Sequence, residues 1–184
     1  IVPYRRFPTT VSVYTKEGTL VKMVNQTPLL EELPKGFMAV KTGRRNINWR
    51  ADHPAILYYV MALDEGNPAN SVEYRDQLFQ WEAPFKNEAI ALIKTKSRVN
   101  GVYWGNATTA VVRDYWWNTR NSKSYVFNPA DVDQIPVVIS DRNIQDVYSD
   151  PGDFVVTEND MGYEVLEIEK NQLFYIGDGF KDEG

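Results

Sequence analysis

The sequence has no cysteine and a single histidine, His53, among its 184 residues. The absence of cysteine excludes a disulfide scaffold, a thiol nucleophile, an iron–sulfur cluster and every zinc site with cysteine ligands. One imidazole likewise excludes a metal site built from several histidines. No apolar run approaches the roughly 18 residues that a membrane span needs, and residues 1–15 hold no run of signal-peptide length. These absences remove most classes of enzyme chemistry.

Aromatic residues are abundant instead, with 5 Trp, 11 Tyr and 8 Phe. With 43% hydrophobic and 24% charged residues, the composition is that of a folded globular domain. The net charge of −5 is unevenly spread, because residues 1–50 are basic and residues 130–184 are strongly acidic. The basic residues are scattered and form no stripe of the kind that binds nucleic acid. We therefore predict two oppositely charged parts of one folded body and no nucleic-acid partner.

Short β-rich runs bounded by turn residues recur along the chain, whereas helical periodicity is scarce. The runs are rich in Val, Ile, Tyr, Phe and Trp, which suit a pleated, half-buried surface. They lie at Thr10–Thr15, Thr19–Val24, Ala55–Leu63, Gln77–Trp81, Ala107–Asp114, Ser124–Asn128, Pro136–Ser140, Tyr163–Ile168 and Gln172–Ile176. Lys16–Gly18 is typical of a hairpin turn. Pro84–Lys94 is compatible with a helix, but Ala89–Ile93 within it is equally compatible with a strand. We predict an all-β fold.

A block of sequence recurs with a spacing near 50 residues. In the first copy, Val40–Thr42 precedes Asn46–Trp49, and in the second, Ile93–Thr95 precedes Asn100–Trp104. Each Trp is followed by a short polar link and an apolar strand, and a fainter third copy begins at Val155. Such a period, with about four strands per unit, is typical of β-propeller blades, whose aromatic residues fill the space between neighbouring blades. We predict about three four-stranded blades, with a β-sandwich as the rival fold.

Three blades do not close a ring, since propellers contain about four to eight of them. We therefore expect a partial β-propeller domain over residues 1–184, with blade boundaries near 1–48, 49–103 and 104–184. The start at Ile1 agrees with a piece of a longer propeller. Open blade edges present unpaired backbone groups, so we also predict self-association through these edges.

A series of sequence blocks follows one another between about Asn46 and Gly179. These blocks are Asn48–Ala55, Ala62–Pro68, Val72–Asp76, Glu82–Phe85, Tyr103–Asn106, Tyr115–Arg120, Ser124–Pro129 and Asp146–Gly152. Together they resemble the propeller domain of the glutamyl endopeptidase branch of the prolyl oligopeptidase family of serine peptidases. Two positions depart from the family's pattern: Gly43–Arg45 stands where Gly-Pro-Arg is expected, and Tyr59 replaces a Trp.

The resemblance implies a larger protein, in which an N-terminal propeller caps a C-terminal α/β-hydrolase domain that carries the catalytic Ser, Asp and His. The nucleophile of such a domain lies in Gly-x-Ser-x-Gly, and no serine of this chain has a glycine two positions away. We therefore assign no catalytic, cofactor-binding or metal-binding residue here. The implied role is the non-catalytic gating and selection of peptide substrates in an exported protein, either periplasmic or extracellular.

Most conspicuous polar and aromatic residues fit structural roles. We predict that His53 is a turn residue braced by Asp52 and that Trp116-Trp117 packs between blades. We also predict that Arg75 with Asp76, and Arg120, take part in ion pairs within or between blades. The acidic residues between 141 and 160 lack the Asp-x-Asp-x-Asp-Gly spacing of a calcium loop and are predicted to lie in solvated loops.

The resemblance also draws attention to arginines, because related propellers direct cations into a central cavity to hold substrate termini or acidic side chains. The matching cations are Arg44, Arg45, Arg50, Arg75 and Arg120. Two other classes of function remain open at this point. One is a stand-alone β-propeller that acts as a binding or interaction module without peptidase activity, and the other is a β-sandwich that binds carbohydrate.

Overall fold

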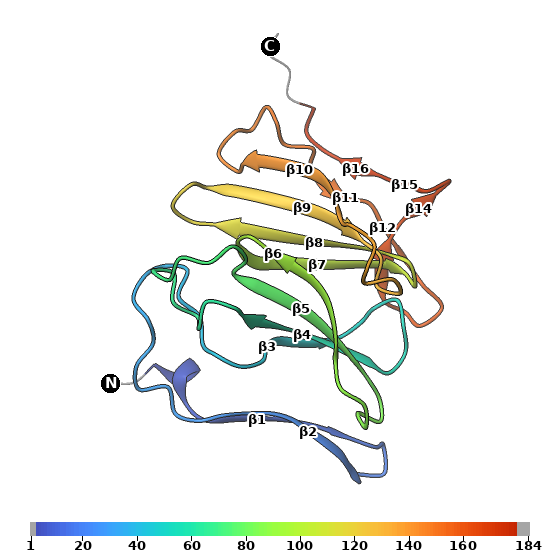
Figure 1. Ribbon diagram of the computed structural model, residues 1–184. Helices are drawn as coiled ribbons and strands as arrows, with labels where there is room; N and C mark the ends of the chain where they lie inside the picture. Colours follow the sequence, from blue (N-terminus) through green and yellow to red (C-terminus); the bar gives the residue numbers. More distant parts are fainter. Residues whose placement is uncertain (1–2, 180–184) are drawn as a thin grey trace.

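A computed structural model describes residues 3–179, and its centre consists of two four-stranded antiparallel sheets (Figure 1). The first sheet contains β3 (Arg45–Trp49), β4 (Ile56–Ala62), β5 (Asp76–Glu82) and β6 (Ile90–Thr95). The second contains β7 (Arg98–Asn106), β8 (Thr109–Trp116), β9 (Asn121–Phe127) and β10 (Val137–Asn143). In both sheets every strand pairs with its neighbour in sequence, as in a propeller blade. The predicted all-β fold with blade-like sheets is confirmed.

Smaller elements flank the two sheets. A short 3-10 turn, η1 (Tyr4–Arg6), leads into a hairpin of β1 (Thr9–Tyr14) and β2 (Leu20–Thr27), at the bottom of Figure 1. The C-terminal strands, drawn in orange and red, are β11 (Asp153–Phe154), β12 (Val156–Glu158), β13 (Glu164–Leu166), β14 (Ile168–Glu169), β15 (Gln172–Leu173) and β16 (Tyr175–Ile176). They pair as β11-β16, β12-β13 and β14-β15. Within residues 3–179, no helix has the length and apolar character needed to cross a bilayer.

The strand predictions agree closely with the structure, since each of the predicted β-rich runs overlaps an observed strand. Lys16–Gly18 forms the predicted hairpin turn, in which the Thr15 N–H donates to the Thr19 carbonyl at 2.9 Å. Of the two alternatives for Pro84–Lys94, the strand is correct, because β6 pairs along β5 and buries Leu92 and Ile93.

The central strands are buried on both faces, and their side chains alternate between two apolar clusters. On β4, Tyr58 and Val60 contact the cluster between the two sheets, whereas Leu57 and Tyr59 belong to the cluster under the hairpin. Adjacent side chains of a strand point to opposite faces, so a strand covered on both sides needs apolar residues at consecutive positions. The run from Ile56 to Ala62 meets that requirement.

Aromatic side chains fill the space between the two sheets, as the repeat predicts. Trp104 is 4% exposed, with its ring centroid 5.3 Å from Tyr58 and 6.2 Å from Phe127. Trp49 occupies the corresponding place in the first sheet, yet it is 41% exposed. The difference follows from what covers each face, because a whole sheet covers Trp104 and only the hairpin lies on the side of Trp49.

The second sheet has a further apolar cluster on its other face, which we call the outer face. Val111 packs there against Phe154 and Leu166 of the C-terminal strands. Gly105 permits this close approach, since a Cβ at that position would lie 2.6 Å from the Ile168 side chain and 2.9 Å from the Thr109 carbonyl oxygen. The C-terminal strands are therefore held by packing that a larger residue at position 105 would disturb.

We predict that Leu78→Ala lowers the free energy of unfolding by about 2–5 kcal/mol, because Leu78 is fully buried between the sheets and its removal leaves a cavity. Urea unfolding followed by tryptophan fluorescence measures the change. The matched control is Leu20→Ala at a side chain that is 54% exposed. Equal losses from the two substitutions would contradict the packing described here.

Candidate functional site

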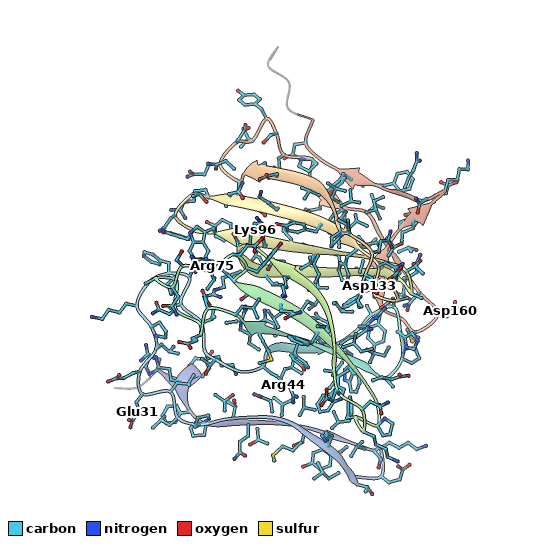
Figure 2. All side chains as sticks on the ribbon, viewed as in Figure 1. Glu31, Arg44, Arg75, Lys96, Asp133 and Asp160 are labelled. Carbon is cyan, nitrogen blue, oxygen red and sulfur yellow. The ribbon has the colours of Figure 1, made fainter. Side chains whose placement is uncertain are left out.

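The five arginines singled out in the sequence do not surround one cavity, and each contacts a different set of side chains. Figure 2 shows Arg44 between the hairpin and the first sheet, whereas Arg75 lies at one end of the sheets. Arg45 is the first residue of β3 and Arg50 follows its last residue, so the two lie at opposite ends of this strand. Arg120 lies in the β8–β9 turn. The contacts of each arginine show whether its guanidinium group is held by other residues of the chain.

A buried network of ion pairs joins the two sheets near the start of β7. Arg98 donates from Nη2 to Asp64 Oδ2 at 2.7 Å and from Nη1 to Asp76 Oδ1 at 2.9 Å. Arg75 Nη1 also donates to Asp64 Oδ2, at 2.8 Å, and Arg45 forms an ion pair with Asp76. Both carboxylates are buried. We call these five residues the ion-pair network.

The prediction that Arg75 and Asp76 take part in ion pairs is correct, but each residue has other partners. Adjacent residues of an extended chain point in opposite directions, so the side chain of Arg75 reaches Asp64 while Asp76 meets Arg98 and Arg45. Asp64 itself follows β4 in a turn, where the Gly66 N–H donates to Asp64 Oδ1 at 3.0 Å.

The charge of Asp64 is stabilised despite its burial. Burial alone raises the pKa of this carboxyl, but hydrogen bonds from Arg98 and Arg75 outweigh it and hold the pKa below its ordinary value of 3.8. A carboxylate that stays ionised and accepts two guanidinium groups is suited to joining segments of chain and not to moving protons. The ion-pair network therefore has a structural role, which is to hold the two sheets together.

Asp114 is another buried carboxylate, outside the ion-pair network, and the sequence analysis did not identify it. It accepts the Ser97 N–H at 3.0 Å, the Lys123 N–H at 3.2 Å and the Tyr125 hydroxyl at 3.4 Å. Burial raises the pKa of Asp114, and burial also raises the pKa of Tyr125. The only signal in the sequence was an acidic residue inside an apolar strand.

Arg44 holds the hairpin against the first sheet. Its guanidinium group donates to the Val24 carbonyl of β2 and lies 4.8 Å from the Tyr59 ring centroid and 4.6 Å from the Trp81 ring centroid. These cation–π contacts place Arg44 between layers of the fold.

Arg50 is likewise held by contacts within the chain, and these contacts show that the predicted bracing of His53 by Asp52 is wrong. Arg50 donates from Nε and Nη2 to Asp52 at 3.0 Å and 2.6 Å, and it lies 4.3 Å from the Trp104 ring centroid. Asp52 therefore braces Arg50 and not His53, because the guanidinium offers two parallel donors. His53 is partly buried, and its Nδ1 lies 2.9 Å from the Pro54 carbonyl oxygen.

Trp116 and Trp117 lie in different surroundings. Arg75, which directly precedes β5 of the first sheet, lies 4.2 Å from the Trp116 ring centroid, in agreement with packing between blades. Trp117 is 38% exposed, stacks on Phe37 at 5.0 Å between centroids, and carries Arg120 at 3.6 Å from its own centroid. Both rings are therefore occupied by neighbours within the chain.

The acidic residues of the C-terminal third act in separate turns and pairs. Asp141 pairs with Lys123 at 2.7 Å, Asp150 pairs with Arg142, and Asp146 accepts the Tyr148 N–H at 3.1 Å. In the part of the chain that the structure describes, no group of three His, Cys, Asp or Glu side chains is arranged to hold a metal ion.

The outer face of the second sheet carries an open cleft of about 650 Å³ beside the C-terminal strands. Its floor is polar, and consists of side chains from β8, β9 and β10 that lie on one face of the sheet: Arg113, Tyr115, Ser122, Ser124, Ser140 and Arg142. We call this set the polar half of the outer face. The rim is formed by the segment from Ile144 to Asp153 and by residues 175–178.

Comparisons with known proteins identify relatives that are much longer than this chain. It is 36% identical over 173 residues, 92% of its length, to a protein of Arabidopsis thaliana named "Probable glutamyl endopeptidase, chloroplastic". It is 34% identical over 174 residues to a protein of the same name from Oryza sativa subsp. japonica. The chain spans 18% and 19% of these relatives. No family model and no solved structure matches the chain.

We predict that Arg98→Met lowers the free energy of unfolding by about 3–5 kcal/mol, because it leaves two buried carboxylates without their shared partner. The matched control is Lys16→Met, since the Lys16–Glu17 pair is exposed and is expected to contribute about 0–1 kcal/mol. Urea unfolding of both variants provides the measurement. An Arg98→Met variant as stable as the control would show that the ion-pair network does not join the sheets.

Asp64 and Asp114 predict opposite dependences of the free energy of unfolding on pH. The pKa of Asp64 is lowered on folding, so its contribution is present above pH 3.8 and is lost as the pH falls through the folded-state pKa. The pKa of Asp114 is raised, so its contribution is present at low pH and is lost as the pH rises through the folded-state pKa. As the pH is lowered from 7, the free energy of unfolding should therefore decline less steeply in Asp64→Asn, and more steeply in Asp114→Asn, than in the unmodified protein. The reverse order of slopes would contradict these assignments.

Proposed function

We propose that this chain is part of the β-propeller domain of a serine peptidase similar to glutamyl endopeptidases. Its role in this proposal is to gate the active site and to select peptide substrates for an α/β-hydrolase domain elsewhere in the same protein. The observation that carries the proposal is the identity of 36% over 92% of the chain to a relative with that name. The two blade-like sheets agree with it.

The geometry of this chain suits a structural wall that encloses an active site better than a catalytic site. The sheets are buried against each other on apolar faces, and their arginines are largely held by carboxylates, carbonyls and aromatic rings. A rigid wall around an active site admits short or unfolded peptides and excludes folded proteins. The chemistry itself would be acyl transfer by a Ser-His-Asp triad outside this chain.

Several finer points belong to this proposal. The sheets begin at Arg45 and Arg98, and the division into blades near residues 48 and 103 stays a prediction. The relatives' names place those proteins in chloroplasts, so a periplasmic or extracellular location for this protein likewise stays a prediction. The implied partners are the hydrolase domain and the peptide substrate.

Self-association through open edges also stays a prediction, and one edge carries features that oppose it. Pro136 precedes β10 and has no N–H to donate, and the β9–β10 register shifts between Val138 and Ser140. Proline and bulges are devices that natural proteins use to limit edge pairing. Val137 and Val138 are nevertheless 58% and 51% exposed on this strand.

A stand-alone binding module is the second candidate, and the open cleft of about 650 Å³ on the outer face favours it. A cleft with a polar floor is suited to holding a ligand without chemistry. In that case the protein would bind its ligand and have no peptidase activity.

The experiment that separates the two candidates uses the full-length protein and a pair of short fluorogenic peptides. One peptide carries Glu at the cleavage position and the control carries Gln. The peptidase proposal predicts cleavage of the Glu peptide, little cleavage of the Gln peptide, loss of activity after treatment with a fluorophosphonate, and resistance of the same Glu sequence within a folded protein. Absence of both cleavage and fluorophosphonate labelling would contradict it and leave the binding module.

A further inference from the structure

The outer face of the second sheet changes its chemistry halfway along the strands. On β8, Val111 lies under the C-terminal strands, and Arg113, two residues further along the same face, lies in the cleft. On β9, Val126 is packed in the same apolar cluster, while Ser124 lies on the cleft floor. The apolar packing under the C-terminal strands therefore ends where Arg113 and Ser124 begin the polar floor of the cleft.

Arg113 is the residue on this floor whose charge has the fewest partners. Its Nε donates to Ser124 Oγ at 3.4 Å, a long hydrogen bond to a neutral group. Among the residues that the structure describes, neither terminal nitrogen of Arg113 has a hydrogen bond or an ion pair within the chain. By contrast, the neighbouring cation Arg142 is paired with Asp150.

The Arg113 side chain is nevertheless held in place. Its guanidinium carbon lies 5.3 Å from the ring centroid of Tyr103 and 5.7 Å from that of Phe154. The two aromatic residues are in contact with each other, with centroids 5.1 Å apart. A guanidinium group that is fixed by rings and free at both terminal nitrogens is preorganised to bind a planar anion through two parallel hydrogen bonds.

Other groups in the cleft match a ligand with several polar atoms. The hydroxyl of Tyr175 is buried at the edge of the cleft without a hydrogen-bond partner in the described part of the chain. Burial of such a group costs free energy unless a partner is supplied. The rim also carries the exposed carboxylates Asp153 and Asp178, which are suited to ammonium or amide groups and oppose a simple, highly charged anion.

We propose that the cleft binds a short peptide through a carboxylate group, which forms paired hydrogen bonds with the terminal nitrogens of Arg113. Peptide amides and a terminal ammonium are accommodated by the hydroxyl groups of the floor and by the rim aspartates. This site does not depend on the proposed peptidase activity, because it requires binding alone.

The test is isothermal titration calorimetry of the full-length protein with the tripeptide Ala-Ala-Asp, with Ala-Ala-Asn-amide, with glutarate and with inorganic phosphate. We expect the tripeptide to bind and the amide, which has no carboxylate, to bind at least tenfold more weakly. Arg113→Met should weaken tripeptide binding roughly 10- to 100-fold through the loss of charge-assisted hydrogen bonds. The affinity of Arg113→Lys for the tripeptide should lie between those of the unmodified protein and Arg113→Met, since an ammonium group does not bind a carboxylate through a fixed pair of donors.

The matched control is Lys94→Met, which removes one exposed cation from β6, outside the cleft, and should leave the affinity unchanged. Hydrogen–deuterium exchange of the unmodified protein provides a readout that does not depend on the folding of any variant, and we expect the tripeptide to protect β8 and β9. Binding of glutarate without the tripeptide would place a free dicarboxylate in the cleft and overturn the peptide assignment. Preference for phosphate, equal affinity in Arg113→Met, or no protection of β8 and β9 would overturn the site.

Discussion

Burial on both faces is the constraint on which the rest of this structure depends. A single four-stranded sheet has two surfaces, and in this chain each of the two sheets has a neighbour on either side: the hairpin, the other sheet, or the C-terminal strands. Consecutive positions of β4 and β8 must therefore be apolar, as Leu57 to Val60 and Ala110 to Val112 are. The abundance of aromatic residues follows from the same constraint, because large rings such as Trp104, Tyr58 and Phe127 fill the space between the layers.

Charged groups are consequently found near the ends of the strands, and there they determine how the layers are joined. Asp64, Asp76 and Arg98 lie at or beside strand ends, where the backbone turns and the apolar faces stop. Because the carboxylates are buried together with guanidinium groups, their charges are balanced locally, and removing one partner would leave an unpaired buried charge. Apolar packing brings the sheets together, and the ion-pair network fixes their relative position.

The sequence predicts the apolar strands, but it misses β3 and β7 and does not show which charged side chains pair. Apolar runs such as Ala55–Leu63 identified a strand directly, whereas Arg45–Trp49 forms a strand although it is largely polar, because it pairs along β4. The partners in the ion-pair network could not be predicted, since Asp64 and Arg98 are separated by 34 residues in the chain. The partner of Asp52 was missed for a different reason: Arg50 is only two residues away, but the sequence does not show toward which neighbour a turn directs the side chain. The cleft had a weak signal, the change on β8 and β9 from apolar residues to Arg113 and Ser124, which a search for apolar periodicity passes over.

The connection between the two sheets has a mechanical consequence. Only Lys96 and Ser97 separate β6 from β7, the Ser97 N–H is held by Asp114, and Arg98 is anchored by two carboxylates immediately afterwards. This junction is therefore poorly suited to act as a hinge, and we expect the two sheets to move together as one rigid unit. We expect any movement of this unit against the hairpin and the C-terminal strands to occur in the longer connections, residues 28–44 before β3 and 144–152 after β10.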